Sequence, residues 1–459
     1  MEPTRILSSF CADTRFADLP SRVILKAKLA ILDTLGCAFA TYSEEPGRAA
    51  IIHRVARQLG ARGKATVIGA AMTASAPVAA LANGVICHSI DFDDLHAEAL
   101  THTSCVILPA ALATAEEAGV SGKDFITSFV LGYEVAVRVG MTVMPSHYDH
   151  WHSTATNGTF GAAVAAGKNH RFGIDRYVHA LGFSGTQAAG LLTYLQFGDY
   201  SKSLNPGKAA FNGVLSAMLA EAGAVAPPNM IENPKGYAAA YSAAPQFEKL
   251  TRGMDGGAMV WEILNNTPKP FPSLSASHTA METTLRLVTG HDLKPADIAK
   301  ITVRTYGVVK AQFSNPRPDN VMAARLSVPY CVAVCAATRR SGLDAFRTRT
   351  IKNAGVREML EKVDIVVDPE LDALYPKALP CQIEITMKNG QVHKDKTYDA
   401  KGSPKNPLSD AELYDKFKRL AEPAIGAKRA NQIVDMTKDL ESIKNVRTFG
   451  RLLRREVDL

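Results

Sequence analysis

Apolar residues recur at helical spacing through the first part of the chain. One set shares a single helical face because its members are three or four residues apart: Ile24, Ala27, Ile31 and Leu35. Runs rich in alanine follow at 106–119, 159–168 and 207–224. No segment before about residue 265 alternates like a strand over a useful length. We therefore expect residues 1–266 to be helical.

The pattern changes at TPKPFPSLSASH, where three prolines fall within five positions and end any helix. Beyond it, residues 301–305 and 383–387 alternate between apolar and polar types, as half-buried strands do. Asn389-Gly390 then predicts a hairpin with a return strand at 391–398. A helix at 278–287 and a strand at 363–367 complete the expected elements. We expect residues 267–400 to form a smaller α+β domain with an antiparallel sheet.

The pattern returns to helix after residue 400. Ser409 and Glu412 have the spacing of a capping box, which starts a helix through about Leu420. We expect residues 401–459 to pack on the first helical region. The predicted fold class is mainly α: residues 1–266 and 401–459 form a large all-α domain, with the α+β domain between them.

Composition narrows the possible partners. The net charge is +7, from 52 basic and 45 acidic residues, and no block of Lys and Arg exists, so nucleic acid is not an expected partner. The uncharged stretch 65–90 is long enough to span a bilayer, but it is rich in small and hydroxyl residues, so we expect a buried helix and no membrane partner. Seven cysteines without a CxxC motif indicate a reducing compartment, so we expect a cytoplasmic protein.

The segment HSIDFDDLHAEALTHTSC, residues 88–105, concentrates titratable groups directly after this uncharged stretch. It holds three carboxylates and three imidazoles: Asp91, Asp93, Asp94, His88, His96 and His102. Such groups can move protons or bind a metal. The metal interpretation lacks a second ligand set of defined spacing. Acidic residues at a helix N-terminus, with Asp93 and Asp94 on the surface, are the alternative structural interpretation. The segment alone leaves these readings open.

Three further segments carry polar groups. SHYDHWHSTATNGTFG contains His147, His150 and His152, and the N–H groups at 158–160 could face an anion at a helix start. In YSKSLNPGKAA, Lys202 and Lys208 flank a Pro-Gly pair expected to precede a helix, although isolated lysines are usually solvated.

Lys269 lies at the predicted domain boundary, and ligands favour such boundaries. No nucleotide loop, nucleophile elbow, flavin motif or haem motif is present. These groups together favour cofactor-free proton abstraction next to a carboxylate, as in elimination, decarboxylation or epimerisation.

Several stretches carry a family resemblance: ANGVICHSIDFDDLH with THTS, WHSTATNGTFGAAVAAGK, SKSLNPGKAAFNGVLSAMLA, KPFPSLSASH, ARLSVPYCVAV and GSPKNPLSDAELYDKF. In this order they resemble the MmgE/PrpD family, which includes 2-methylcitrate dehydratase, cis-aconitate decarboxylase and iminodisuccinate epimerase. The resemblance implies an all-α domain made from both chain ends, an α+β lid, a homodimer, and an active site in the cleft between domains that needs no metal and no cofactor. Matched motif by motif, it implies five catalytic positions: Asp91, His102, His152, Lys202 and Lys269.

The expected function is therefore that of a lyase acting on a small di- or tricarboxylate, with 2-methylcitrate-like dehydration as the central case. A decarboxylase or an epimerase on the same scaffold is the alternative. A metal-dependent hydrolase and a non-catalytic carboxylate-binding protein come from other classes. We expect His102 to act as general base or acid, with Asp91 fixing its tautomer or sharing its proton. The two lysines and His152 would bind carboxylates and stabilise an enolate-like intermediate.

Three residues depart from the family pattern: Leu95, Thr103 and Asn205. Leu95 stands where members often have Thr or Tyr, Thr103 where Pro is usual, and Asn205 where many have His. The changes at Leu95 and Asn205 remove polar contacts that could recognise a substrate hydroxyl or carboxylate. We expect them to alter substrate specificity.

Overall fold

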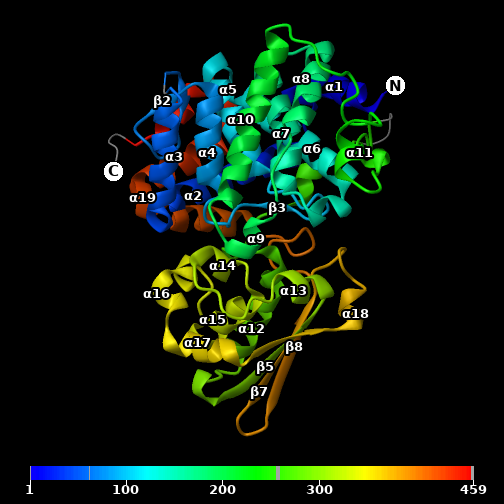
Figure 1. Ribbon diagram of the computed structural model, residues 1–459. Helices are drawn as coiled ribbons and strands as arrows, with labels where there is room; N and C mark the ends of the chain where they lie inside the picture. The colour runs from blue at the N-terminus through cyan, green and yellow to red at the C-terminus, as the bar shows by residue number, and fades with distance from the viewer. Residues whose placement is uncertain (1, 61, 255–258, 456–459) are drawn as a thin grey trace. The chain divides into compact units, whose positions relative to one another are not determined.

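The computed structural model of the chain describes residues 2–60, 62–254 and 259–455 (Figure 1). It divides into two compact units. The first comprises Met1–Leu192, Tyr200–Thr267 and Ser409–Leu459, and the second Thr193–Asp199 and Pro268–Leu408. Two short segments, 193–199 and 401–408, belong to the second unit, although the sequence prediction assigned them to the helical region. The first of them does so because Leu195 packs against the core of the second unit.

The first unit is built from helices. They are α1 (Pro3–Asp13), α2 (Ser21–Glu44), α3 (Pro46–Gln58), α4 (Ala76–His88), α5 (Ser104–Ala118), α6 (Gly122–Val143), α7 (Ser153–Asn169), α8 (Ile174–Gln187), α10 (Ser201–Glu221), α11 (Tyr237–Tyr241), α19 (Asp410–Lys438) and α20 (Arg447–Leu453). Two antiparallel pairs of two-residue strands join them: β1 (Ala65–Thr66) with β2 (Thr73–Ala74), and β3 (Leu95–His96) with β4 (Asn266–Thr267).

Helix α7 lies in the middle of this unit and packs against α5, α6, α8 and α10. Small residues allow the close approaches. A Cβ atom on Gly84 of α4 would lie 2.6 Å from the Cα atom of Gly207 in α10, so neither position accepts a larger side chain without movement. The glycine and alanine runs of the sequence are therefore the contact surfaces of this core.

The C-terminal segment returns to the first unit, where α19 packs along α2 (Figure 1). The predicted capping box is confirmed: Ser409 Oγ accepts from the Glu412 backbone N–H at 3.3 Å, and the Glu412 carboxylate accepts from the Ser409 N–H at 2.7 Å. The helical segment continues past Leu420 to Lys438, with a kink at Gly426, where φ is +76°.

The second unit is the α+β part. Its helices are α9 (Tyr194–Phe197), α12 (His278–Gly290), α13 (Gly307–Gln312), α14 (Val321–Arg325), α15 (Val328–Thr338), α16 (Thr348–Ile351), α17 (Ala354–Glu361) and α18 (Pro369–Asp372). Its strands are β5 (Ile298–Thr305), β6 (Val363–Val367), β7 (Cys381–Met387) and β8 (Val392–Thr397), in the order β6-β5-β7-β8.

The predicted strands and the hairpin at Asn389-Gly390 are confirmed, and Gly390 has the positive φ (+84°) that such a turn favours. The sheet is mixed rather than purely antiparallel. Strands β5 and β6 pair in parallel. Parallel neighbours need a long connection, and here helices α13 to α17 form the crossover between the two strands. The mainly α class with an α+β part stands.

One described helix, α6, is long and apolar enough to cross a membrane by length and composition, and its apolar window is wholly buried in the first unit. The uncharged stretch 65–90 forms β1, β2 and the buried helix α4, as a core segment does.

Candidate active site

The titratable segment connects α4 to α5 as an irregular loop, residues 89–103. Asp91 adopts φ +54° and Leu100 φ +46°, which are left-handed conformations that L-residues rarely adopt. Asp91, Asp93 and Asp94 are each at most 1% exposed. The alternative of surface acidic residues at a helix N-terminus is therefore wrong, because these carboxylates are buried among histidines and other polar partners.

Lys202 connects two members of this loop region. It lies in the first turn of α10, and its Nζ donates to Asp91 Oδ1 at 2.7 Å and lies 3.2 Å from His88 Nε2. An ammonium group only donates, so His88 Nε2 accepts, and its ring proton is on Nδ1. Two of the five predicted catalytic residues, Asp91 and Lys202, are thus in direct contact inside the first unit.

His88 and His102 share one carboxylate. His88 Nδ1 lies 2.8 Å from Asp93 Oδ2, and His102 Nδ1 lies 3.4 Å from the same oxygen atom. The two imidazole rings meet edge to face, with centroids 4.7 Å apart. His88 and Asp93 are fully buried, whereas the His102 side chain is 13% exposed. His102 is therefore the imidazole of this group that solvent or a ligand can reach.

His152 completes the cluster in the first unit. It precedes α7, its ring centroid is 5.9 Å from that of His88, and the Asn205 amide donates to its Nδ1 at 3.1 Å. Asn205 is three residues after Lys202 on α10, so both side chains project on the same side of the helix. The departure at Asn205 thus lies within the cluster, next to a predicted catalytic residue.

Burial and mutual contacts determine the charge states in the cluster. Burial lowers the pKa of His88 to about 4, although Asp93 opposes the shift. Burial, together with nearby His88 and Lys202, lowers the pKa of His152 well below its usual value. Burial raises the pKa of Asp93, but His88 and His102 more than offset this, so its pKa lies well below the usual range. Asp93 is therefore an anion, whereas His88 and His152 are neutral imidazoles.

Two neighbouring groups have other roles. Burial raises the pKa of Asp94 to about 7, even though its carboxylate accepts hydrogen bonds from Ser104 and Asn266. Burial raises the pKa of the Cys105 thiol well above its usual value, and this thiol donates to the His102 carbonyl at 3.1 Å. Cys105 is thus a protonated packing group and not a thiolate nucleophile.

The loop is also held from distant parts of the chain. Lys416 of α19 is buried, donates to the Phe92 carbonyl at 2.8 Å and pairs with Asp33 of α2 at 2.7 Å. The His102 backbone N–H donates to Thr154 Oγ1 at 3.0 Å. These partners were missed by sequence reasoning, because no spacing connects residue 92 to residue 416.

The two helix starts that were expected to form anion sites are wrongly placed. Helix α7 begins at Ser153 and α10 at Ser201, so Gly158–Phe160 and Pro206-Gly207 lie inside helices, not at their starts. Interior helical N–H groups are bonded within the helix and cannot face an anion. It is Lys202, in the first turn of α10, that lies at a helix start.

The other residues noted in the sequence have different surroundings. His147 bonds to the Tyr241 carbonyl and to Thr156 Oγ1, at 3.1 and 2.7 Å, which is a structural role. Leu95 is buried in β3. Lys269 belongs to the second unit, where its side chain is 1% exposed. The structure therefore brings four of the five predicted residues together in one unit, and the role of Lys269 stays a prediction.

Atoms within the cluster could also hold a metal ion. Ligand atoms of His88, Asp91 and His102 lie within 4.8 Å of one another, as do those of His88, Asp93 and Cys105. Both sets use His88, and Lys202 Nζ contacts His88 and Asp91. A divalent cation in the first set would have to displace or repel this ammonium group. The donor set thus fits the resident lysine better than a metal.

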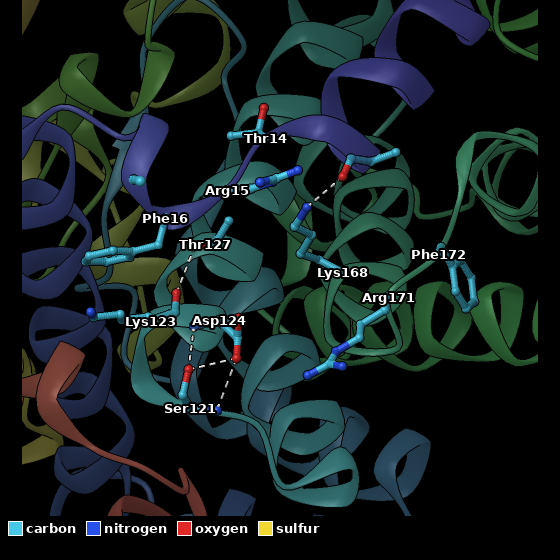
Figure 2. Close-up of a pocket in the computed structure, with 12 residues that line it drawn as sticks. Thr14, Arg15, Phe16, Ser121, Lys123, Asp124, Thr127, Lys168, Arg171 and Phe172 are labelled. Carbon is cyan, nitrogen blue, oxygen red and sulfur yellow. Dashed lines mark hydrogen bonds between the residues drawn. The ribbon is translucent and has the colours of Figure 1, made fainter.

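A pocket of about 610 Å³ lies apart from this cluster, between the end of α1, the start of α6 and the end of α7 (Figure 2). Four basic residues line it: Arg15, Lys123, Lys168 and Arg171. Lys168 Nζ already donates to two backbone carbonyls, at 2.9 and 3.1 Å. The negative charges of three nearby carboxylates also attract the ammonium group of Lys168: Asp13, Asp124 and Asp18. The basic charge here is largely offset, so we do not place the active site in this pocket.

The fold and the cluster together define an acid–base enzyme with a helical unit into which an α+β unit is inserted. The family models agree: the MmgE/PrpD N-terminal domain matches residues 5–250, and the MmgE/PrpD C-terminal domain matches residues 271–442. The chain belongs to the MmgE/PrpD family.

Similar proteins cover nearly the whole chain. A cis-aconitate decarboxylase-like protein, oryM, of Aspergillus oryzae is 25% identical over 99% of this chain and 98% of its own length. The cis-aconitate decarboxylase of Homo sapiens is 28% identical over 95% and 91%, and that of Aspergillus terreus is 26% identical over 95% and 92%. These relatives are decarboxylases, which belong to the lyases, and the protein is a lyase.

Proposed function

We propose that the protein is a lyase of small di- or tricarboxylates, and that its reaction is decarboxylation of a cis-aconitate-like tricarboxylate. The observation that carries the proposal is the buried Lys202 ammonium group, held between Asp91 and His88 beside the partly exposed His102. An ammonium group with an imidazole beside it suits a substrate carboxylate that reacts with proton transfer. The names of the relatives favour decarboxylation over the dehydration that the sequence motifs first suggested.

In the proposed decarboxylation, one carbon–carbon bond breaks and one carbon–hydrogen bond forms. The C–C bond to one carboxylate breaks, carbon dioxide leaves, and the electron pair stays on the remaining carbon framework, delocalised toward a neighbouring carboxylate. His102, as imidazolium, delivers a proton to the carbon, and Lys202 stabilises the charge that builds on the neighbouring carboxylate. His152 contributes a ring N–H donor, because Asn205 donates to its Nδ1 and leaves the proton on Nε2.

Dehydration of a 2-methylcitrate-like substrate is the second candidate. The same imidazole would first remove a proton and then protonate the leaving hydroxyl group. Asn205 bears on the choice. Its amide N–H donates to His152. Many family members have a histidine in place of Asn205, so a substrate hydroxyl group meets a different set of donors here. An epimerase would use the same proton transfer without loss of a group.

One panel of substrates separates these reactions. Purified protein is incubated in D2O with cis-aconitate, citrate-type and 2-methyl-substituted tricarboxylates, and with imino- and hydroxydicarboxylates. Ultraviolet absorbance, carbon dioxide capture and proton NMR follow each reaction. We expect one carbon dioxide per substrate consumed and one deuterium in the product. Change in double-bond absorbance without carbon dioxide means dehydration, and exchange without net loss means epimerisation.

His102→Ala should abolish turnover on the active substrate, and His170→Ala, a distant surface histidine paired with Glu221, is the matched control. Full activity in His102→Ala would contradict the acid–base assignment. Lack of turnover on the whole panel would favour a carboxylate-binding protein.

Metal removal tests the hydrolase alternative. Dialysis against a chelator, followed by metal assay, should leave activity unchanged, because Lys202 contacts the donor atoms that a metal would use. Stoichiometric metal and activity that is lost on chelation and restored by one cation would overturn the cofactor-free reaction. Lys269 as a carboxylate-binding cation and a homodimeric assembly remain predictions of the family resemblance.

A further inference from the structure

We propose that Asp93, the second aspartate of the loop, is a positioning residue that holds His102 and His88 in their Nδ1–H tautomers, so that His102 presents Nε2 to the substrate. This assignment deepens the proposed function, since it rests on the acid–base role of His102. The sequence led us to expect Asp91, and not Asp93, as the partner that fixes the tautomer of His102.

The geometry of the carboxylate supports this role. Asp93 Oδ2 lies 2.8 Å from His88 Nδ1 and 3.4 Å from His102 Nδ1, so one oxygen atom faces both rings on the same nitrogen. Asp93 is fully buried, whereas His102 is partly exposed. The carboxylate lies behind the two imidazoles, so we assign it to act through them and not by direct contact with the substrate.

The three aspartates of the loop have separate partners. Asp91 accepts from Lys202 at 2.7 Å. Asp94 accepts from the Ser104 backbone N–H at 3.2 Å and from the Ser104 hydroxyl at 2.5 Å. Asp93 forms ion pairs with both His88 and His102. The adjacent carboxylates therefore provide a natural control for its removal.

A carboxylate behind an imidazole has two effects on proton transfer. It accepts the Nδ1–H bond, which leaves Nε2 with its lone pair to take or return a proton. Its negative charge also stabilises the imidazolium form and so raises the pKa of the histidine. The second histidine fits the same scheme, because His88 Nε2 must accept from Lys202 and its proton must face Asp93. Asp93 would thereby keep both the imidazole of His102 and the ammonium group of Lys202 in place.

The activity test compares Asp93→Asn with Asp94→Asn. Asp93→Asn should lower kcat about 100-fold, with KM changed less than about threefold, because the amide can impose the wrong tautomer. The limb of the kcat/KM profile that reports His102 should move to lower pH by about one unit, since a neighbouring negative charge is lost. Asp94→Asn perturbs the same buried loop but should leave that limb in place. Asp93→Glu, which keeps the charge, should recover part of kcat.

Two results would overturn the role. One is Asp93→Asn with kcat within threefold of wild type. The other is equal loss of kcat in Asp93→Asn and Asp94→Asn with the same pH profile, which is what a merely structural residue would give. Thermal unfolding of each variant shows whether it is folded.

A measurement on the wild-type chain requires neither turnover nor a variant of Asp93. With 15N-labelled histidine, two-dimensional NMR of the rings distinguishes protonated from unprotonated nitrogen atoms. The signals of His102 and His88 are identified by their absence in His102→Gln and His88→Gln. We expect Nδ1–H for both rings. An Nε2–H tautomer with unprotonated Nδ1 in His102 would overturn the assignment. Because no substrate is present, this result is independent of whether the protein decarboxylates anything.

Discussion

The loop 89–103 of the first unit and one face of strand β7 in the sheet of the second unit are both largely buried, but they consist of opposite kinds of residue. In strand β7 the buried positions are Cys381, Ile383, Ile385 and Met387, and the residues between them are half-buried. The buried positions of the loop include Asp91, Asp93, Asp94 and His96, and the buried His88 directly precedes it at the end of α4. The sheet gains free energy from apolar burial, whereas the loop must offset the desolvation of each polar group with a specific partner.

The difference explains where chemistry can occur. A sheet residue tolerates any neighbour of suitable size, whereas Asp91 in the loop depends on the Lys202 ammonium group of a distant helix. Groups that are costly to bury have pKa values far from their usual range, and such groups serve acid–base catalysis. If the comparison is right, changes in the loop alter activity and pH dependence, and changes in the sheet alter only stability.

The largest effect should come from Lys202→Met. The change leaves the Asp91 carboxylate buried without its ammonium partner and removes the cation proposed to bind the substrate. We expect kcat/KM to fall at least about 1,000-fold, which corresponds to about 4 kcal/mol of transition-state stabilisation. Steady-state kinetics on the active substrate measures it. Lys208→Met, an exposed lysine on the same helix, is the control and should retain activity.

Lys416→Met should destabilise the protein by about 3–5 kcal/mol, because it leaves Asp33 buried without its cation and frees the Phe92 carbonyl. Denaturant unfolding measures the loss. Adding Asp33→Leu should recover most of it, since a buried pair replaced by apolar residues is often neutral in stability. If Lys416→Met and Asp33→Leu are each as stable as wild type, Lys416 of α19 does not hold the loop in place.

Ile385→Ala in the sheet should cost about 3 kcal/mol of unfolding free energy, because the side chain is fully buried in the core of the second unit. The pH profile of activity should not change at temperatures where the variant is folded. Thr386→Ala, the half-buried neighbour, should cost less than about 1 kcal/mol. A shifted pH profile in Ile385→Ala would break the separation between the two regions.

The smallest effect is the change in unfolding free energy expected for His147, which lies shortly before His152 in the sequence. Burial lowers its pKa to about 4, whereas an unfolded histidine titrates near 6.5. Its contribution to stability is therefore fully present above pH 6.5 and is lost as pH falls toward 4. The stability advantage of wild type over His147→Gln should shrink by about 1.4 kcal/mol per pH unit in that window. An advantage that is constant between pH 7 and 4.5 would contradict the buried neutral imidazole.

The sequence predicted those helices and strands whose buried face follows a regular spacing of apolar residues or whose start has a capping motif. The face through Ile31 became α2, the alternation around Ile385 became β7, and the capping box at Ser409 started α19. The starts of α7 and α10 were misplaced by several residues because glycine and proline were taken as helix boundaries. Here Gly158 and Pro206 lie inside helices, and Gly207 beside Pro206 allows a close helix contact.

The sequence by itself determined the family, the mainly helical class with its α+β part, and a set of candidate catalytic residues, since motifs and periodicities are local. Only the tertiary structure decided which of these groups meet. Lys202 reaches Asp91 across 111 residues, and Lys416 reaches Phe92 across 324. Local pattern cannot distinguish Asp93 from Asp94, yet one faces two imidazoles and the other a hydroxyl and an amide. Their opposite pKa shifts follow from those partners, because the energy of a buried charge depends on what surrounds it in space.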